Sequence, residues 1–292
     1  MMDQANRLRS MVVQRDINHL QNNMNRNIKI YTIASGKGGV GKTNIAVNMA
    51  IAMQKKGQRV MILDADLGLA NVDVVLGIYP SITLYDVMFK NKHLNDAVVS
   101  GPGGIRIIPG GSGMMEMTKI DGKRQGELAK QFTEIEDIDI LLIDTGAGIS
   151  MNQLSFITFS HEVILVTTPE PTSITDVYSV MKIIAELKMK KKVKLIVNKA
   201  TSSKLAELTY EKLQKTSSNF LGINLEYLGY VVDDVRVVNS VMKQVPFILQ
   251  YPNCLASQSI ERISDRIMGE EVQGTKIRTM SEVYNRLFKI FG

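Results

Sequence analysis

The stretch that most constrains this chain is Gly36–Thr43, which reads Gly-Lys-Gly-Gly-Val-Gly-Lys-Thr. It matches the phosphate-loop pattern G-x-x-x-x-G-K-[ST] at every fixed position. The glycines let successive backbone N–H groups turn toward phosphate oxygens, Lys42 neutralises phosphate charge, and the hydroxyl of Thr43 can bind Mg²⁺. The sequence therefore predicts a nucleotide cradle formed by Gly36, Gly38, Gly39, Val40, Gly41, Lys42, Thr43 and Asn44.

The residues on either side of the loop support this interpretation. Residues 28–34 form a short apolar stretch that is rich in β-forming residues, and residues 44–53 have the pattern of a helix. A strand, the loop and then a helix is the order that the motif requires. The N-terminal end of that helix would also point its positive partial charge at the bound anion.

Beyond the loop, strand-like and helix-like segments alternate along the chain. Several strands are almost continuously apolar, which is typical of a parallel sheet covered on both faces. The pattern predicts one doubly wound, mostly parallel α/β domain. The expected further strands are 59–63, 104–108, 139–143, 162–166, 193–197 and 225–230, and helices are expected at 120–132, 175–187 and 203–216.

Composition excludes several kinds of site. The 292 residues contain one cysteine, Cys254, so neither an intrachain disulfide nor a CxxC metal site is possible, and a reducing cytoplasm is expected. No secretory signal is visible in the first residues, and no apolar run approaches the ~20 residues that a membrane span needs.

The net charge of +6 is concentrated at the two ends of the chain. Residues 1–26 hold four arginines against two aspartates, which gives +2, and residues 275–292 hold four basic residues against one glutamate, which gives +3. Residues 27–274 therefore carry only +1, so a broad nucleic-acid-binding face is not expected.

Acidic residues follow two of the predicted strands. Asp64 and Asp66 follow residues 60–63, and Asp144 follows the apolar run 140–143 as in a Walker-B strand. Carboxylates at the carboxyl ends of such strands face the ligand crevice. They could orient Mg²⁺ hydration and position an attacking water, while Gly146 and Gly148 would let the second loop move.

Recognition of the nucleotide base is assigned to two further segments. Asn198 directly follows the strand 193–197, where its amide can both accept from and donate to an adenine edge. An asparagine that starts a turn is the simpler alternative. Residues 232–235 are expected on the other side of the base.

Three units are predicted along the chain: a mobile basic segment at 1–26, the nucleotide-binding domain at 27–268, and a linker with an amphipathic helix at 269–292. On a helix, one apolar stripe of the last unit would contain Ile277, Met280, Tyr284, Leu287, Phe288 and Phe291. With basic residues beside the stripe, this is the pattern of an interfacial helix on anionic lipid. The same pattern also fits a terminal helix docked on its own core.

The loop K-G-G-V-G-K-T, with Lys37 as its extra lysine, resembles the deviant P-loop of MinD/ParA-type ATPases. The N-terminal run Asp-Gln-Ala-x-x-Leu-Arg, at residues 3–9, resembles the motif of the FlhG-type branch of that family, which controls flagellar placement. Together with both acidic segments and the amphipathic tail, the resemblance covers nearly the whole chain.

The resemblance implies a role for each matching residue. Lys37 would reach across an ATP-dependent homodimer to the partner's ATP. Asp66 would be the hydrolytic aspartate, and Asn71 would lie near the partner's nucleotide. Asp64 and Asp144 would support Mg²⁺ together with Thr43, and Asn198 would read adenine.

The resemblance also implies partners and a location. These are ATP and Mg²⁺, an SRP-type flagellar GTPase (FlhF) stimulated by residues 1–26 through Gln4, and flagellar switch-complex proteins. An anionic membrane would be contacted by residues 275–292, which places the protein in the cytoplasm on the inner face of the cell membrane. No specific nucleic acid is expected.

Four alternatives remain open from the sequence. A MinD-type ATPase that places division septa gives no reason for the motif at residues 3–9. A ParA-type partition ATPase needs a basic body, and an iron–sulfur relative needs paired cysteines. A metabolic kinase or ligase on the same fold needs a site for a second substrate, and none is visible.

Overall fold

The computed structural model describes residues 27–66, 72–111, 122–269 and 277–291. The central element is one sheet in the order β3-β4-β2-β5-β1-β6-β7-β8. Its strands are β1 (Lys29–Ser35), β2 (Val60–Ala65), β3 (Val99–Ser100), β4 (Arg106–Ile108), β5 (Ile140–Ala147), β6 (Glu162–Thr167), β7 (Lys192–Ala200) and β8 (Asn224–Val232). All neighbouring pairs are parallel except β3 and β4 at one edge. The predicted doubly wound, mostly parallel α/β sheet is confirmed.

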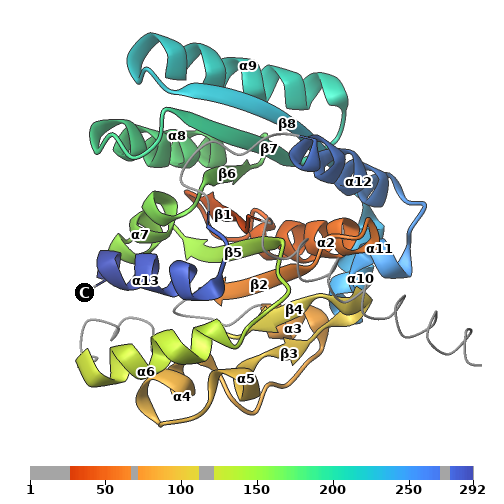
Figure 1. Cartoon of the computed structure of the whole chain (residues 1–292). Coiled ribbons are helices and arrows are strands. Elements are labelled where there is room, and N and C mark those ends of the chain that lie inside the picture. Colours follow the sequence, from red (N-terminus) through yellow and green to blue (C-terminus); the bar gives the residue numbers. More distant parts are fainter. Residues whose placement is uncertain (1–26, 67–71, 112–121, 270–276, 292) are drawn as a thin grey trace, which may run out of the picture.

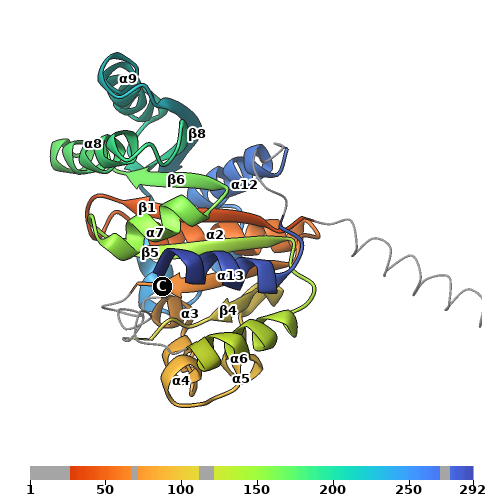
Figure 2. The same cartoon turned by 60° about the vertical axis from the view of Figure 1, so that its left-hand side comes forward.

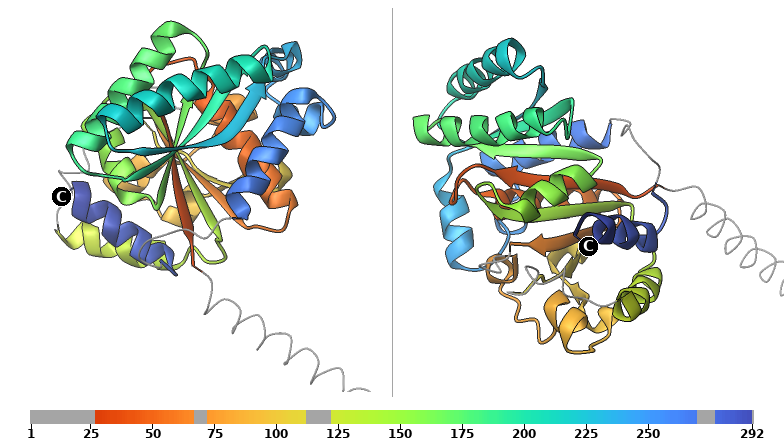
Figure 3. Two further views of the ribbon diagram at one scale, coloured as in Figure 1. Left: turned by 90° about the horizontal axis from the view of Figure 1, so that it is seen from above. Right: turned by 90° about the vertical axis from the view of Figure 1, so that its left-hand side faces the viewer.

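Helices cover both faces of this sheet, as Figures 1 and 3 show. One face packs against α2 (Lys42–Lys55), α3 (Val72–Leu76), α11 (Phe247–Gln250) and α12 (Leu255–Met268). The opposite face packs against α4 (Leu84–Phe89), α5 (Leu94–Ala97), α6 (Gly122–Thr133), α7 (Met151–Phe159), α8 (Pro171–Glu186), α9 (Ser203–Phe220) and α13 (Met280–Phe291). A short 3₁₀ turn (Pro102–Gly104) and α10 (Val235–Met242) complete the order.

Side chains alternate between the two faces of the sheet along each strand, and this alternation produces a separate apolar layer on each face. In β5, Ile140 and Leu142 face the α2 side, whereas Leu141 and Ile143 face the opposite side. All four are buried because both faces are covered, which is why the strand reads as a continuous apolar run.

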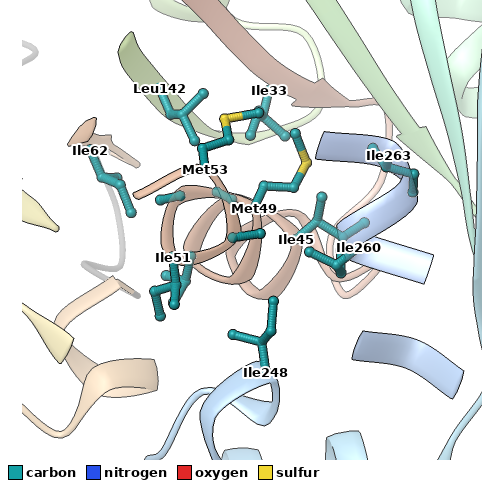
Figure 4. Close-up of a cluster of buried hydrophobic side chains, with 14 of the residues drawn as sticks. Ile33, Ile45, Met49, Ile51, Met53, Ile62, Leu142, Ile248, Ile260 and Ile263 are labelled. Atoms are coloured by element: carbon teal, nitrogen blue, oxygen red, sulfur yellow. The ribbon is translucent and has the colours of Figure 1, made fainter. Parts of the chain in front are cut away.

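Helix α2 lies at the centre of its layer and is buried on almost every side (Figure 4). Its apolar residues contact the sheet on one side and α11 and α12 on the other, as Figure 4 shows for Ile45, Met49 and Ile260. This packing fixes the helix that begins at the phosphate loop, so the loop itself has a rigid base.

The structure differs from the sequence prediction at two places in the sheet. Strand β3 was not predicted, because two residues carry no readable alternation. Strand β2 continues through Asp64 to Ala65, and β5 continues through Asp144 to Ala147. The strands are thus longer than predicted, and Asp64 and Asp144 lie near their carboxyl ends, as the sequence predicted.

The C-terminal helix α13 lies docked against the body beside α6 and α7 (Figure 2). Ile277, Met280 and Tyr284 of the predicted apolar stripe are buried, together with Val283. The ring of Tyr284 lies 4.8 Å from that of Phe132 in α6. The stripe is thus covered by the protein's own core as far as it is described, which is the alternative to a free interfacial helix; the side chains of Leu287, Phe288 and Phe291 lie outside the described part.

Candidate nucleotide site

The phosphate loop runs between β1 and α2, at the carboxyl end of the central strands. Two of its glycines are required by close approach. A Cβ on Gly36 would lie 2.2 Å from the backbone carbonyl of Asp176 in α8, and a Cβ on Gly41 would lie 2.3 Å from the side-chain nitrogen of Asn198. Gly41 also has a φ of 94°, which favours glycine. The loop is therefore shaped by contacts with segments more than a hundred residues away.

Lys42 is buried at the first position of α2. Its ammonium donates a hydrogen bond of 2.9 Å to the hydroxyl of Ser35, at the end of β1. Burial lowers the pKa of Lys42, while the nearby carboxylates of Asp144 and Asp66 oppose this shift. The positive charge is thus held in a desolvated place, where its attraction for phosphate is strong.

Asp64 and Asp144 are direct neighbours in the paired strands β2 and β5. Asp64 accepts from the backbone N–H groups of Asp66 and Val72, at 3.1 and 3.3 Å. Asp144 is 1% exposed, and neither of its carboxylate oxygens has a hydrogen-bond partner among the described residues. Burial, and then the negative charge of Asp64, raise the pKa of Asp144 to about 7, while the nearby hydroxyl of Thr43 and then the charge of Lys42 oppose the rise.

These groups fit a divalent cation bound together with phosphates. No cluster of three or more His, Cys, Asp or Glu side chains in the described part of the chain could hold a metal alone. Mg²⁺ commonly takes one or two carboxylates and fills its other positions with water and phosphate oxygens. Asp64, Asp144 and the hydroxyl of Thr43 would hold it, and it would supply charge neutralisation at the phosphates.

Asp66 lies against Gly146, near the end of β5. A Cβ on Gly146, at the end of β5, would lie 3.0 Å from the Oδ1 atom of Asp66. Asp66 also lines the pocket described below. The structure thus brings together the ends of β1, β2 and β5, as the sequence predicted for these carboxylates.

A pocket of about 670 Å³ opens beside the loop. Polar groups of the loop and Asp66 line it, and so do Val232, Asp233 and Asp234 of the predicted segment 232–235. The remaining apolar lining was missed by sequence reasoning because most of it comes from α10, a helix with no recognisable motif: Val75, Val237, Val238, Val241 and Met242. The size and mixed lining suit a nucleotide with a base on the apolar side.

Asn198 lines this pocket and also braces the loop. Its side-chain N–H donates to the carbonyl of Val40 at 2.7 Å, and the ammonium of Lys199 donates to the carbonyl of Gly39 at 3.0 Å. Asp233 and Asp234 lie on the pocket wall as well, and Asp234 caps α10 and pairs with Arg236 at 2.8 Å. Adenine recognition by Asn198 stays a prediction, with loop support as an additional role.

Lys37 lies outside the pocket and is bound to its own chain. Its ammonium contacts the carboxylate of Glu170 at 3.2 Å and the hydroxyl of Thr172 at 3.1 Å, both at the start of α8. The Lys37 side chain is 41% exposed, so this ion pair is weak. The lysine can therefore leave it. The predicted Asn71 and residues 1–26 lie outside the described residues.

Comparison with known proteins agrees with this geometry. Residues 27–268 match the family described as "ParA: NUBPL iron-transfer P-loop NTPase". The chain is 39% identical to the antiactivator FleN of Pseudomonas aeruginosa, covering 82% of this chain and 86% of FleN. It is 34% identical to the flagellum site-determining protein YlxH of Helicobacter pylori, covering 91% and 92%.

A solved structure gives the same result for the fold. The septum site-determining protein MinD of Pyrococcus horikoshii, complexed with Mg-ADP, superposes with a TM-score of 0.66 at 26% identity, covering 83% of this chain and 96% of MinD. The matching family is one of P-loop NTPases, so a nucleotide is the ligand class of this site. The chain belongs to the ParA/MinD family of P-loop ATPases, in the branch that includes FleN and YlxH.

Proposed function

We propose that this protein is an ATP-dependent, dimerising and membrane-associating ATPase that regulates the placement and number of flagella. The observation that carries the proposal is the site at the ends of β1, β2 and β5, which holds Lys42, Asp64 and Asp144. This site belongs to a chain that is similar to FleN and YlxH along most of its length. ATP would be the nucleotide and Mg²⁺ the metal.

Dimerisation through the nucleotide face is supported by apolar side chains around the pocket. Val238 and Met242 line the pocket and are 56% and 79% exposed. Met151, the first residue of α7, is 78% exposed. A second copy of the chain would cover these residues. Lys37 would then exchange Glu170 of its own chain for the partner's nucleotide.

Molecular mass in solution tests the dimer. With ADP we expect a monomer, and with a non-hydrolysable ATP analogue a dimer. Asp66→Ala should accumulate a dimer with ATP itself, whereas Lys37→Ala should stay monomeric. Normal dimerisation of Lys37→Ala would refute its role toward the partner's nucleotide, and a mass that never depends on nucleotide would refute the switch.

Membrane contact through residues 275–292 requires α13 to leave its seat, because Met280, Val283 and Tyr284 are buried in the docked state. No described helix has the length and apolar character to cross a bilayer, so the contact would be peripheral. One short helix binds lipid weakly, and two helices in a dimer bind far more strongly through effective concentration. ATP would therefore control membrane binding through the dimer.

A basic residue of the body near α13 supports an anionic surface as the target of the helix. Lys190 lies close enough to Arg286 of α13 for that charge to contribute to lowering the pKa of Lys190, after burial. Positive charge from the body and from the helix thus gathers in one region, where anionic headgroups would be attracted.

Liposome sedimentation tests the membrane proposal. Deletion of 275–292 should abolish binding to anionic vesicles in the presence of ATP. Phe132→Ala, which removes the ring under Tyr284, should loosen the seat and increase binding without ATP. Phe220→Ala removes an exposed ring on α9 and is the matched control. Retained binding by the deleted protein would contradict the proposal.

Stimulation of the SRP-type GTPase FlhF is assigned to residues 1–26, and flagellar switch-complex proteins are the expected partners of the body. A peptide of residues 1–26 should stimulate GTP hydrolysis by the cognate GTPase, and the same peptide with Gln4→Ala should not. Equal rates with and without the peptide would refute this partner.

A further inference from the structure

Gln153 is a buried side chain in the first turns of α7 that none of the predicted site residues accounts for. It is 3% exposed. Its side-chain nitrogen donates to the carbonyl of Ser35 at 3.2 Å and to the carbonyl of Gly146 at 3.3 Å. Two carbonyl partners fix the orientation of the amide, because only its nitrogen can donate to both.

The other end of this amide is unusual. The Oε1 atom of Gln153 is buried and has no hydrogen-bond partner among the described residues. A buried acceptor without a partner costs about 1–3 kcal/mol. An apolar side chain of the same length would avoid that cost but would remove the donor from the carbonyls of Ser35 and Gly146, so the reason for a glutamine here is the pair of carbonyls that it holds. Such exceptions occur where function requires them.

Both carbonyls that Gln153 holds belong to the nucleotide site. Ser35 ends β1, its hydroxyl accepts the hydrogen bond from Lys42, and its carbonyl also accepts from the N–H of Gly148 at 3.2 Å. Gly146 is the residue against which the carboxylate of Asp66 lies. The amide of Gln153 therefore joins the end of β1, which leads into the phosphate loop, to the end of β5, where Gly146 lies against Asp66.

We propose that Gln153 is a positioning residue for ATP hydrolysis, which fixes Gly146 relative to Ser35 and thereby sets where the carboxylate of Asp66 stands. Gln153 does not touch the nucleotide, so it acts through Gly146. The inference rests on the proposed ATP hydrolysis. It assigns a role to a side chain that belongs to neither the phosphate loop nor the acidic segments.

The test replaces Gln153 with methionine, which keeps the length and removes the donor. Thr158→Met, an exposed polar-to-apolar change on the same helix, is the control. For Gln153→Met we expect the single-turnover rate of ATP hydrolysis to fall about tenfold, the equivalent of one or two hydrogen bonds. ADP affinity should change less than about twofold, because Lys42 and the loop backbone are untouched, and Thr158→Met should match the wild type.

A second variant changes the contact between Gly146 and Asp66 directly. Gly146 has no positive φ, so Gly146→Ala is compatible with its backbone, while the new Cβ would press on Asp66. It should also slow hydrolysis and preserve ADP affinity. This variant keeps the test valid even if Gln153→Met does not fold.

Three outcomes decide the matter. Slower hydrolysis with preserved ADP affinity and melting temperature supports a positioning role. Unchanged hydrolysis in both variants overturns it. Hydrolysis, ADP affinity and melting temperature that fall together indicate a structural role and also overturn it. A wild-type protein that does not hydrolyse ATP would instead refute the proposed function, so the two failures are distinguishable.

Discussion

The two ends of the central sheet both hold buried charges, but they neutralise them to different degrees. At the amino end, Lys194 is 1% exposed and lies between Glu162 and Glu226, at 3.3 and 3.2 Å. At the carboxyl end, Asp144 is equally buried, and its oxygens have no hydrogen-bond partner among the described residues. The first charge is held by β6, β7 and β8, and the second lies on β5, which β1 separates from β6 in the same sheet.

The difference separates structural from functional charge. A buried ion that is surrounded by opposite charges is complete, and removing a partner costs stability. A buried ion without partners costs stability as it stands, and it becomes favourable only when a ligand supplies the missing charge. We therefore expect the amino end to behave in the first way and the carboxyl end in the second.

The largest effect is expected at the amino end. Lys194→Met would leave the partly buried carboxylates of Glu162 and Glu226 without the buried cation that they share, although Glu226 would keep its ion pair with Lys192. We expect the free energy of unfolding to fall by about 3–5 kcal/mol, measured by urea denaturation. The folded fraction should bind ADP as the wild type does. A variant as stable as the wild type would show that this charge cluster is not needed for the fold.

Lys42→Ala should have the complementary effect. Removing the cation from the loop should weaken ADP binding by at least about 100-fold, because a desolvated charged contact is worth 2–5 kcal/mol. A fluorescence titration with labelled ADP measures it, and Lys55→Ala at the other end of α2 is the control. Affinity within tenfold of the wild type would mean that backbone N–H groups alone hold the phosphates.

The raised pKa of Asp144 predicts that the stability of the nucleotide-free protein falls as the pH rises. The carboxyl of Asp144 has a pKa of about 7, above its ordinary value of 3.8. Its contribution to the stability of the nucleotide-free protein is therefore fully present below about pH 4 and is lost as the pH rises through 7. Asp144→Asn should remove this loss, so the melting temperature of the variant should exceed that of the wild type at pH 8 and not at pH 4. Parallel pH profiles would contradict it.

The smallest effect is expected for an exposed charge at the amino end. Asp137 pairs with Arg59, which is also held by Asp139 at 2.9 Å, and the Asp137 side chain is 54% exposed. Asp137→Asn should change the free energy of unfolding by less than about 1 kcal/mol, and asparagine tolerates the positive φ at this position. A loss as large as that of Lys194→Met would remove the distinction between exposed and buried pairs.

Sequence reasoning predicted the carboxyl end well and the amino end poorly. The loop, Asp64, Asp66 and Asp144 follow apolar strands in a fixed order, so local patterns were enough. Lys194, Glu162 and Glu226 come from three different strands, and only the register of β6, β7 and β8 brings them together. Nothing in the sequence marks them as a cluster.

Other features were ambiguous for physical reasons. The stripe of α13 reads the same whether it is covered by lipid or by α6 and α7, because both surfaces are apolar. Gln153 has no motif, and its role depends on two carbonyls that come close only in the folded chain. The contact of Lys37 with Glu170 likewise depends on the start of α8 lying beside the loop.

The most direct test of the account is the Mg²⁺ dependence of ADP binding at pH 8, measured by calorimetry for the wild type and Asp144→Asn. Removing Mg²⁺ should weaken ADP binding strongly in the wild type and little in the variant, because the cation would neutralise the buried carboxylate of Asp144. An equal loss in both proteins would show that Asp144 does not serve the metal, and would contradict the account.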